Sequence, residues 1–184
     1  PTPLITPTTK AEKGGHDLPT TVDDVASSGV IDPHLWTEIQ KVALELFHRG
    51  SEIASRAGFI LADTKYEFGL APDGSLLLID EMHTPDSSRF WAADSLEERL
   101  ANGEGPESFD KEPVRLAMSA TGYRGDGPIP TLPDSVWAAA SARYVELYER
   151  LTGLPFVPGE QPATDRIRRN LSEVLATNEA DISA

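Results

Sequence analysis

Three charged side chains occupy every second position of a segment that otherwise reads as a β-strand. Residues 61–69 read LADTKYEFG, and Asp63, Lys65 and Glu67 share one parity of this run. Because successive side chains of a strand point to opposite faces, these three charges would lie on one face of a sheet. A solvated charge ladder and a cleft for a charged ligand both explain this pattern. The neighbouring segments must decide between them.

Apolar periodicity around this segment predicts an antiparallel hairpin. One strand would cover residues 59–70, the turn 71–74 (APDG) and the return strand 75–82. The return strand is apolar at both parities, which is typical of a strand covered on both faces, until Asp80 and Glu81 interrupt it. A lone buried carboxylate is costly without a compensating ion or donor. The two acids therefore indicate a site.

The register of the hairpin decides which acid lies beside Glu67. In the register that we favour, closed by a four-residue loop, Lys65 lies opposite Asp80, and Glu67 is a diagonal neighbour of Asp80 on the same face. A three-residue loop with a glycine bulge would shift the pairing by one residue and bring Glu81 to that face instead. Two carboxylates beside a lysine suit Mg²⁺ and a phosphate, because Mg²⁺ fills much of its shell with phosphates and water. We expect Glu67 and Asp80 to hold Mg²⁺.

A segment dense in short polar groups follows the return strand. Residues 84–89 read TPDSSR, and we expect them to form a loop opened by Pro85. Hydroxyls, backbone N–H groups and a guanidinium suit the recognition of phosphate or carboxylate. An Asp-Ser turn that caps the next element would have the same composition.

Helical periodicity predicts most of the remaining chain. Asp32 and Pro33 supply an N-cap and a first-turn proline for a long helix that would run to about Arg56. Further helices are predicted near residues 111–120, from 134 to the stop signal at Gly153, and near 164–176. We therefore expect an α+β fold that is rich in helices, with an antiparallel hairpin that lines the active site.

The elements divide the chain into three parts. Residues 1–30 read as an extended segment and loop of the substrate side, 31–160 as a catalytic lobe, and 161–184 as a C-terminal helix and tail. Pro1 and the residues after it read like mid-chain sequence.

The composition excludes several classes of partner. The 184 residues include 16 Lys and Arg against 30 Asp and Glu, which gives a net charge of −14 and repels nucleic acids and anionic membranes. No apolar run is long enough to span a membrane. Cysteine is absent, which excludes disulfides and thiolate metal sites and fits a cytoplasmic protein.

The two polar segments together resemble the two signatures of SAICAR synthetases. Residues 61–69 resemble the first and 80–89 (DEMHTPDSSR) the second, in the family's order and at the separation expected across a hairpin. The resemblance extends to TPTTKAE at 6–12 with GHD at 15–17, to SFDK at 108–111, and to the helix around YVELYERLTG at 144–153. It covers nearly the whole chain up to Phe156. Glu112 departs from it, since the family has glutamine there.

The resemblance implies an ATP-dependent ligase of purine biosynthesis with a SAICAR synthetase-like fold, related to ATP-grasp. ATP would phosphorylate the carboxylate of carboxyaminoimidazole ribonucleotide, and the amine of L-aspartate would displace phosphate from the acyl phosphate to give SAICAR. The family's N-terminal ATP lobe, with its glycine-rich hairpin, is not in this sequence. We therefore expect the chain to need that lobe as a partner in order to bind ATP.

Carried onto this sequence, the resemblance implies a role for each matching residue. Glu67 and Asp80 would hold Mg²⁺ on the ATP phosphates. Lys65, Asp86 and Arg89 would form the catalytic centre, with Lys65 and Arg89 binding anionic groups of the ribonucleotide and the transferring phosphoryl group. The other substrate-binding positions would be Lys10, His16, Asp17, Asp63, Ser87, Ser88, Asp110 and Lys111.

Two other functions fit a chain with this hairpin. A non-catalytic remnant could keep the fold, but it has no reason to keep costly charges converged at Lys65, Glu67, Asp80 and Arg89. A different kinase-like, ATP-dependent enzyme could share the metal-binding hairpin, and the TPDSSR segment argues against it.

Overall fold

The structure, a computed structural model, describes residues 2–10 and 17–182. This part of the chain contains six helices and four short strands. In chain order they are α1 (Val22–Ser27), α2 (Pro33–Arg56), β1 (Phe59–Thr64), β2 (Glu67–Leu70), β3 (Leu76–Ile79), β4 (Ser88–Ala92), α3 (Leu96–Ala101), α4 (Glu112–Ala120), α5 (Asp134–Thr152) and α6 (Ala163–Ile182). The strands form two antiparallel pairs, β1 with β4 and β2 with β3. The fold is therefore α+β and rich in helices, as the sequence predicts.

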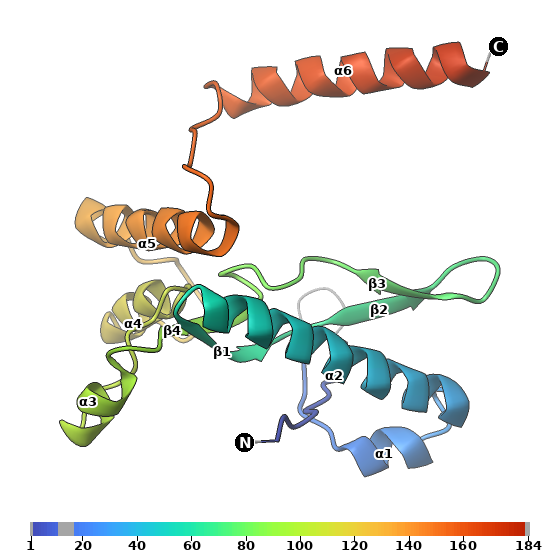
Figure 1. Ribbon diagram of the computed structural model, residues 1–184, viewed down its shortest axis with the longest axis horizontal. Coiled ribbons are helices and arrows are strands. Elements are labelled where there is room, and N and C mark those ends of the chain that lie inside the picture. Colours follow the sequence, from blue (N-terminus) through green and yellow to red (C-terminus); the bar gives the residue numbers. More distant parts are fainter. Residues whose placement is uncertain (1, 11–16, 183–184) are drawn as a thin grey trace.

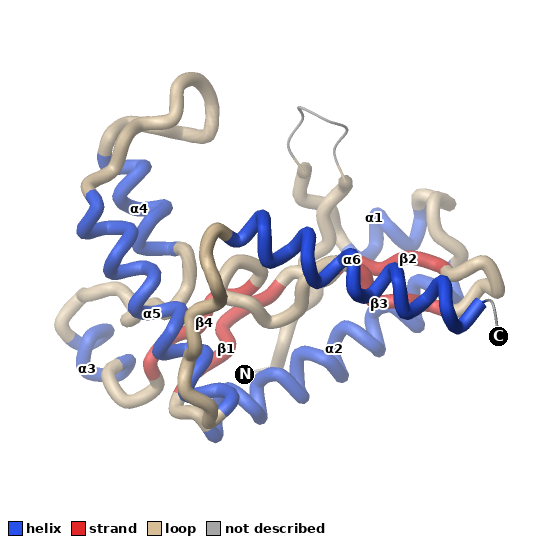
Figure 2. The backbone as a smooth tube through the Cα atoms, turned by 90° about the horizontal axis from the view of Figure 1, so that it is seen from above, coloured by secondary structure: helices blue, strands red, loops and turns tan. Residues whose placement is uncertain are grey.

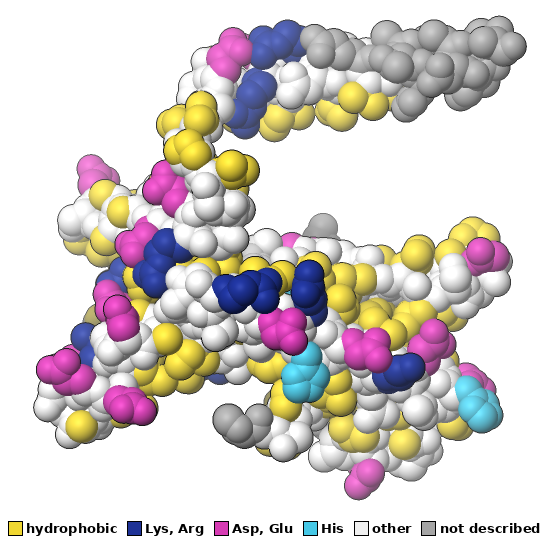
Figure 3. Space-filling model, in the orientation of Figure 1, with side chains coloured by type: hydrophobic (Ala, Val, Ile, Leu, Met, Phe, Trp, Pro, Cys, Tyr) yellow, Lys and Arg dark blue, Asp and Glu magenta, His cyan; other side chains and the backbone are white. Residues whose placement is uncertain are grey.

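The long helix α2 runs alongside both sheets, and α4 and α5 lie at the end of the molecule where β1 pairs with β4 (Figures 1 and 2). Helix α6 stands apart from this body at the end of an extended segment (Figure 1). Hydrophobic side chains line the side of α6 that faces the body (Figure 3), and Ile167, Leu171 and Val174 are all exposed. No helix among the described residues is long and apolar enough to cross a membrane.

Helix α2 begins and ends where the sequence predicts. The Asp32 carboxylate accepts hydrogen bonds from the N–H groups of His34 and Leu35 at 2.9 and 3.1 Å, which satisfies two donors of the first turn. Beyond the last turn, Gly58 has φ +79°, a left-handed conformation that other residues avoid, and turns the chain into β1.

The core lies between α2, the β1–β4 pair and α5. Phe59 contacts Phe109 edge to face, with ring centroids 4.9 Å apart, and Leu147 of α5 is 1% exposed beside them. Arg150 of α5 lies over the Phe59 ring at 3.9 Å and donates hydrogen bonds to the Ala57 carbonyl. This arginine therefore ties α5 to the end of α2.

The predicted strand over residues 59–70 is divided in the structure. Its first half, β1, pairs with β4, and only its second half, β2, forms the hairpin with β3. The break falls at Lys65, whose N–H donates to the Ser87 carbonyl at 2.9 Å. The predicted loop at 84–89 is accordingly shorter, because Ser88 and Arg89 belong to β4.

The register that we favoured for the hairpin is wrong by one residue, and the alternative is correct. Glu67 pairs with Ile79, and the Ala71 N–H donates to the Ser75 carbonyl at 2.9 Å. The turn residue Gly74 has φ +86° and donates to the Ala71 carbonyl, which closes the tighter loop. Local turn geometry thus decides the register.

Three helices differ from the sequence-based expectation. The segment 1–30, expected to be extended, contains α1, and α3 is an additional helix. Both have 6 residues, which is too short for a periodic apolar pattern. Helix α6 continues to Ile182, beyond the predicted end. The structure confirms α4 and α5, including the left-handed Gly153 that ends α5.

Candidate active site

The two signature segments lie side by side in the structure. Thr64 at the end of β1 pairs with Ser88 at the start of β4, and their hydroxyl oxygens are 2.8 Å apart. Asp63 pairs with Arg89 in the same ladder. The loop at residues 84–87 therefore runs directly beside the point where the chain passes from β1 to β2.

A charged cluster of Lys10, Asp17, Lys65 and Glu67 lies where the chain passes from β1 to β2. The Lys65 ammonium is 2.6 Å from one carboxylate oxygen of Glu67 and 4.0 Å from the Asp17 carboxylate. Lys10, from the N-terminal segment, forms a close ion pair with the second oxygen of Glu67. The structure thus brings together four of the predicted site residues, two of which lie more than 40 positions before the hairpin in the sequence.

The electrostatics of this charged cluster keep Lys65 and Glu67 ionised. Hydrogen bonds from Lys10 and then from Lys65 lower the pKa of Glu67 from 4.5 to about 2. The hydrogen bond with Glu67 in turn raises the pKa of Lys65 above its ordinary value. Since the Lys65 side chain is 57% exposed, its ammonium can reach an anionic ligand.

The two acids that follow β3 have different surroundings. Asp80 has φ +66°, so the alternation of the strand stops at Ile79 and neither acid continues the ladder. The charge of Asp80 contributes to the raised pKa of Lys65, whereas the Glu81 carboxylate accepts a close hydrogen bond from Thr84. Asp80 thus acts on the charged cluster despite the shifted register. Among the described residues, no three His, Cys, Asp or Glu side chains converge as a metal site.

Arg89 and Asp63 form a second charged pair across β1 and β4. The Arg89 Nε donates to Asp63 Oδ2 at 2.8 Å, and a terminal nitrogen of the guanidinium contacts the same oxygen. Both side chains are about half exposed. The negative charge of Glu112 also acts on Arg89, and Glu112 itself is held by Arg115 through two hydrogen bonds. The sequence analysis did not single out Arg115. Its signal was Glu112, an acid three positions earlier on the same predicted helix, where the two side chains can pair.

The loop at residues 84–87 is held by hydrogen bonds from several elements. The Thr84 hydroxyl oxygen accepts from the N–H groups of Asp86 and Ser87, and the Thr84 N–H donates to the Ser87 hydroxyl. The Lys111 N–H, at the start of α4, donates to the Pro85 carbonyl at 3.2 Å. From α5, the Tyr144 hydroxyl donates to Asp86 Oδ1 at 2.9 Å. Asp86 is exposed, so its carboxylate is accessible to a ligand.

Two predicted substrate-binding residues lie in the interior. Asp110 is completely buried, and its carboxylate accepts hydrogen bonds from the N–H groups of Phe90 and Glu112 and from the Ser108 hydroxyl. Ser88 is 4% exposed and hydrogen-bonded to Thr64. In this structure Asp110 presents no surface to a ligand and Ser88 presents very little. We interpret both as residues that hold the site together.

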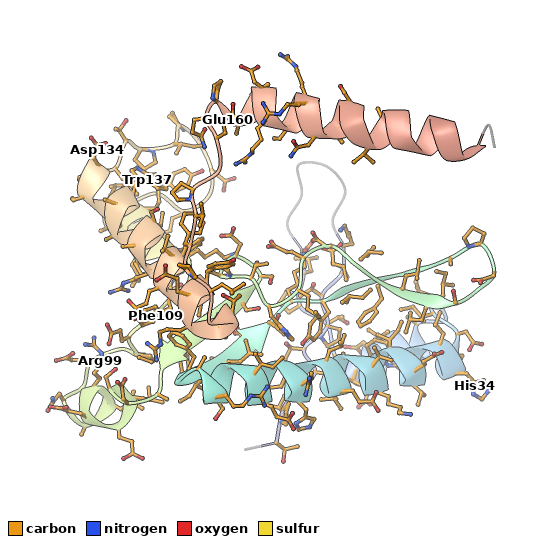
Figure 4. All side chains as sticks on the ribbon, turned by 45° about the horizontal axis from the view of Figure 1, so that its top comes forward. His34, Arg99, Phe109, Asp134, Trp137 and Glu160 are labelled. Carbon is orange, nitrogen blue, oxygen red and sulfur yellow. The ribbon has the colours of Figure 1, made fainter. Side chains whose placement is uncertain are left out.

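An apolar cavity of about 560 Å³ lies beside the loop, between α4 and α5. Asp86 and Lys111 lie on its lining, together with four aromatic side chains, Trp137, Tyr144, Tyr148 and Phe156. Figure 4 shows Trp137 near the start of α5 and the core residue Phe109 closer to its other end.

The predicted residue His16 lies outside the described residues.

The charged residues of the candidate site gather where the two strand pairs of an α+β fold meet, and comparison with known proteins identifies the family. A model of the SAICAR synthetase family matches residues 1–129. The chain belongs to this family.

Curated relatives agree with this assignment. A putative phosphoribosylaminoimidazole-succinocarboxamide synthase 2 of Mesorhizobium japonicum is 46% identical over 171 residues, which is 92% of this chain and 55% of that protein. The chloroplastic phosphoribosylaminoimidazole-succinocarboxamide synthase of Arabidopsis thaliana is 42% identical over 181 residues, covering 96% of this chain and 43% of that protein. The chain spans about half the length of the curated relatives it matches.

Solved structures also resemble the chain. A SAICAR synthase from Saccharomyces cerevisiae complexed with SAICAR has a TM-score of 0.61 and 29% identity, over 78% of this chain and 45% of that one. A SAICAR synthetase (Type-2) in complex with ADP has a TM-score of 0.54 and 26% identity, over 78% of this chain and 48% of that one. The fold of the matched part of the chain is therefore that of part of a SAICAR synthetase.

Proposed function

We propose that the protein joins L-aspartate to carboxyaminoimidazole ribonucleotide, with ATP as co-substrate, and releases SAICAR, ADP and phosphate. The observation that carries this proposal is the convergence of Lys10, Lys65 and Glu67 beside the loop of Asp86 and next to Arg89. The solved neighbours that bind SAICAR and ADP support it. We include in the proposal an ATP-binding lobe of the family type, related to ATP-grasp, and a cytoplasmic location.

The charges of the site suit a reaction between three anionic substrates. Phosphates and carboxylates repel one another, so their approach requires cations. Lys65 and Arg89 are paired with acids but remain 57% and 52% exposed. Both members of the Arg89–Asp63 pair are about half exposed, and such pairs are worth only about 0–1 kcal/mol, so Arg89 can exchange its acid for a substrate anion at little cost. Lys65 can turn to a substrate anion because Lys10 also pairs with Glu67. The site therefore has two cations, Lys65 and Arg89, that are accessible to substrate anions.

Mg²⁺ fits the two carboxylates that the sequence singles out. Glu67 is held ionised and Asp80 acts on the same lysine, so both provide the hard oxygen ligands that Mg²⁺ prefers. Lys10 and Lys65 now contact the two oxygens of Glu67, and at least one of these ammonium groups must move for a metal ligand bond to form. Bound Mg²⁺ would offset the negative charge of the ATP phosphates.

The proposed chemistry has two steps. The carboxylate of the ribonucleotide attacks the γ-phosphorus of ATP, which forms an acyl phosphate and releases ADP. The amine of aspartate then attacks the acyl carbon; the C–N bond forms, the C–O bond to phosphate breaks, and the nitrogen loses a proton. Lys65 would neutralise the transferring phosphoryl group, Arg89 would hold an anionic group of the ribonucleotide, and Asp86 would shape the pocket.

The substitution Lys65→Met in the intact enzyme tests this proposal, with Lys41→Met as the matched control. Lys41 is an exposed lysine of α2 whose ammonium is 3.9 Å from Glu45, away from the charged cluster. We expect Lys65→Met to lower the rate of SAICAR formation at least about 100-fold, because removing one charge-stabilising group typically has that effect. Lys41→Met should match the parent enzyme.

The melting temperature separates a catalytic role from a structural one. Lys65→Met should melt within about 2 °C of the parent, because the Lys65 side chain is exposed and Lys10 still pairs with Glu67. A parent enzyme that makes no SAICAR, or a Lys65→Met variant that keeps full activity, would overturn the proposal. A variant that melts far below the parent would make Lys65 a structural ion-pair partner.

A further inference from the structure

A single side chain of α5 reaches the carboxylate of the loop. The Tyr144 hydroxyl donates to Asp86 Oδ1 at 2.9 Å across 58 positions of sequence. Tyr144 is half-buried and also lines the apolar cavity between α4 and α5. A half-buried tyrosine hydroxyl requires a polar partner, and Asp86 supplies it.

The hydrogen bond fixes a carboxylate that is otherwise free to turn. Within the described part of the chain, the loop's backbone is held by hydrogen bonds with Thr84, Lys111 and the Lys65 N–H, and none of these involves the Asp86 carboxylate. The Tyr144 hydroxyl is the donor that does. It occupies one carboxylate oxygen and leaves the other available for a ligand.

Helix α5 provides a rigid support for this contact. The residue before Tyr144, Arg143, donates to the Ser108 carbonyl at 2.6 Å. Two turns further along, Arg150 donates to the Ala57 carbonyl and lies over Phe59 in the core. Since α5 is attached to the core on both sides of Tyr144, its hydroxyl is a fixed reference point for the loop.

We propose that Tyr144 is a positioning residue that orients the Asp86 carboxylate toward the bound ribonucleotide. The inference rests on the proposed function, in which Asp86 shapes the substrate pocket. Burial and the neighbouring Asp86 both raise the pKa of Tyr144 above its ordinary value, so the hydroxyl remains a donor at any working pH.

The test compares Tyr144→Phe with Tyr148→Phe in the intact enzyme. Both changes remove one hydroxyl from the same helix, and the Tyr148 hydroxyl makes no hydrogen bond within the described part of the chain. We expect Tyr144→Phe to raise the KM for the ribonucleotide about five- to tenfold, the effect of losing one partly exposed hydrogen bond to a charged group. The KM for ATP should change less than about twofold, since nothing in this contact concerns ATP. Tyr148→Phe should match the parent.

A double-mutant cycle shows whether Tyr144 acts through Asp86. In an Asp86→Asn background, adding Tyr144→Phe should have less than about a third of its effect on kcat/KM, because the two changes remove the same interaction. An undiminished effect would overturn the inference, as would a Tyr144→Phe variant that behaves like Tyr148→Phe.

Hydrogen exchange supplies a readout that does not depend on activity. Without the contact, the backbone N–H groups of Asp86, Ser87 and Ser88 should exchange several times faster in Tyr144→Phe than in the parent or in Tyr148→Phe. If the parent makes no SAICAR, the proposed function fails, and this measurement still decides whether Tyr144 holds the loop. Unchanged exchange at these three residues would refute the positioning role.

Discussion

Replacing Asp110 by asparagine tests whether this residue binds substrate or holds the site together. Its carboxylate is completely buried, and Oδ2 accepts from the Phe90 N–H at 3.1 Å and the Ser108 hydroxyl at 2.9 Å. Oδ1 accepts from the Glu112 N–H at 2.7 Å, near the start of α4. Asparagine has the same shape but only one acceptor oxygen, so an NH₂ group must replace one of these two oxygens.

Either orientation of the asparagine side chain leaves a buried N–H group facing another donor. If the amide oxygen faces Glu112, the Phe90 N–H loses its acceptor, although the Ser108 hydroxyl can rotate to accept from the new NH₂. If it faces Phe90 instead, the Glu112 N–H loses its acceptor. An unsatisfied buried group costs about 1–3 kcal/mol, and the remaining bonds lose their charged acceptor. We therefore expect Asp110→Asn to lower the free energy of unfolding by about 2–4 kcal/mol.

Thermal unfolding of the intact enzyme measures this effect. At about 2–4 °C per kcal/mol for a chain of this size, the melting temperature should fall by about 4–16 °C. Asp94→Asn is the matched control, because Asp94 is exposed, and it should change the free energy by less than about 0.5 kcal/mol. At a temperature where the variant is folded, its KM for the ribonucleotide should stay within about threefold of the parent. A variant that melts like the parent but has a greatly raised KM would refute the reasoning and make Asp110 a substrate ligand.

The remaining predictions concern charged residues of the site. Glu67→Gln should lower stability by about 1 kcal/mol at neutral pH, an amount reduced by the exposure of both lysines. Because the folded-state pKa of Glu67, about 2, lies below the ordinary 4.5, its contribution is complete above pH 4.5 and is lost as the pH falls toward 2. Acid titration of unfolding should therefore show less loss in Glu67→Gln than in the parent over that range, and equal losses would contradict the assignment. Arg89→Lys should lower kcat/KM for the ribonucleotide about tenfold and leave the KM for ATP unchanged, because an ammonium cannot form the two parallel bonds of a guanidinium. An unaffected ribonucleotide response would remove Arg89 from the site. Asp80→Asn should raise the Mg²⁺ concentration needed for half-maximal activity severalfold more than Glu81→Gln, since Glu81 is already committed to Thr84. The reverse order would transfer the metal role to Glu81.

The amino-acid sequence was sufficient to single out the two segments that form the candidate site. Asp63, Lys65 and Glu67 stand out because charges at alternate positions of a strand are unusual, and the TPDSSR segment stands out by its composition. Local signals also placed the start of α2 at Asp32 and the end of α5 at Gly153, because caps and left-handed glycines act within one turn of the chain.

Only the tertiary structure decided how these segments pair and which of their residues are buried or exposed. The apolar pattern over residues 59–70 fits one strand as well as two, and the change of partner at Lys65 depends on β4, which lies more than 20 positions away. Asp86 and Asp110 are both acids of motifs that resemble the family, yet Asp110 is buried and accepts from three donors, whereas Asp86 is exposed. The contact between Tyr144 and Asp86 depends on how α5 packs against the core. Periodicity and caps report interactions within a few residues, whereas burial and hydrogen-bond partners are set by segments that meet only when the chain folds.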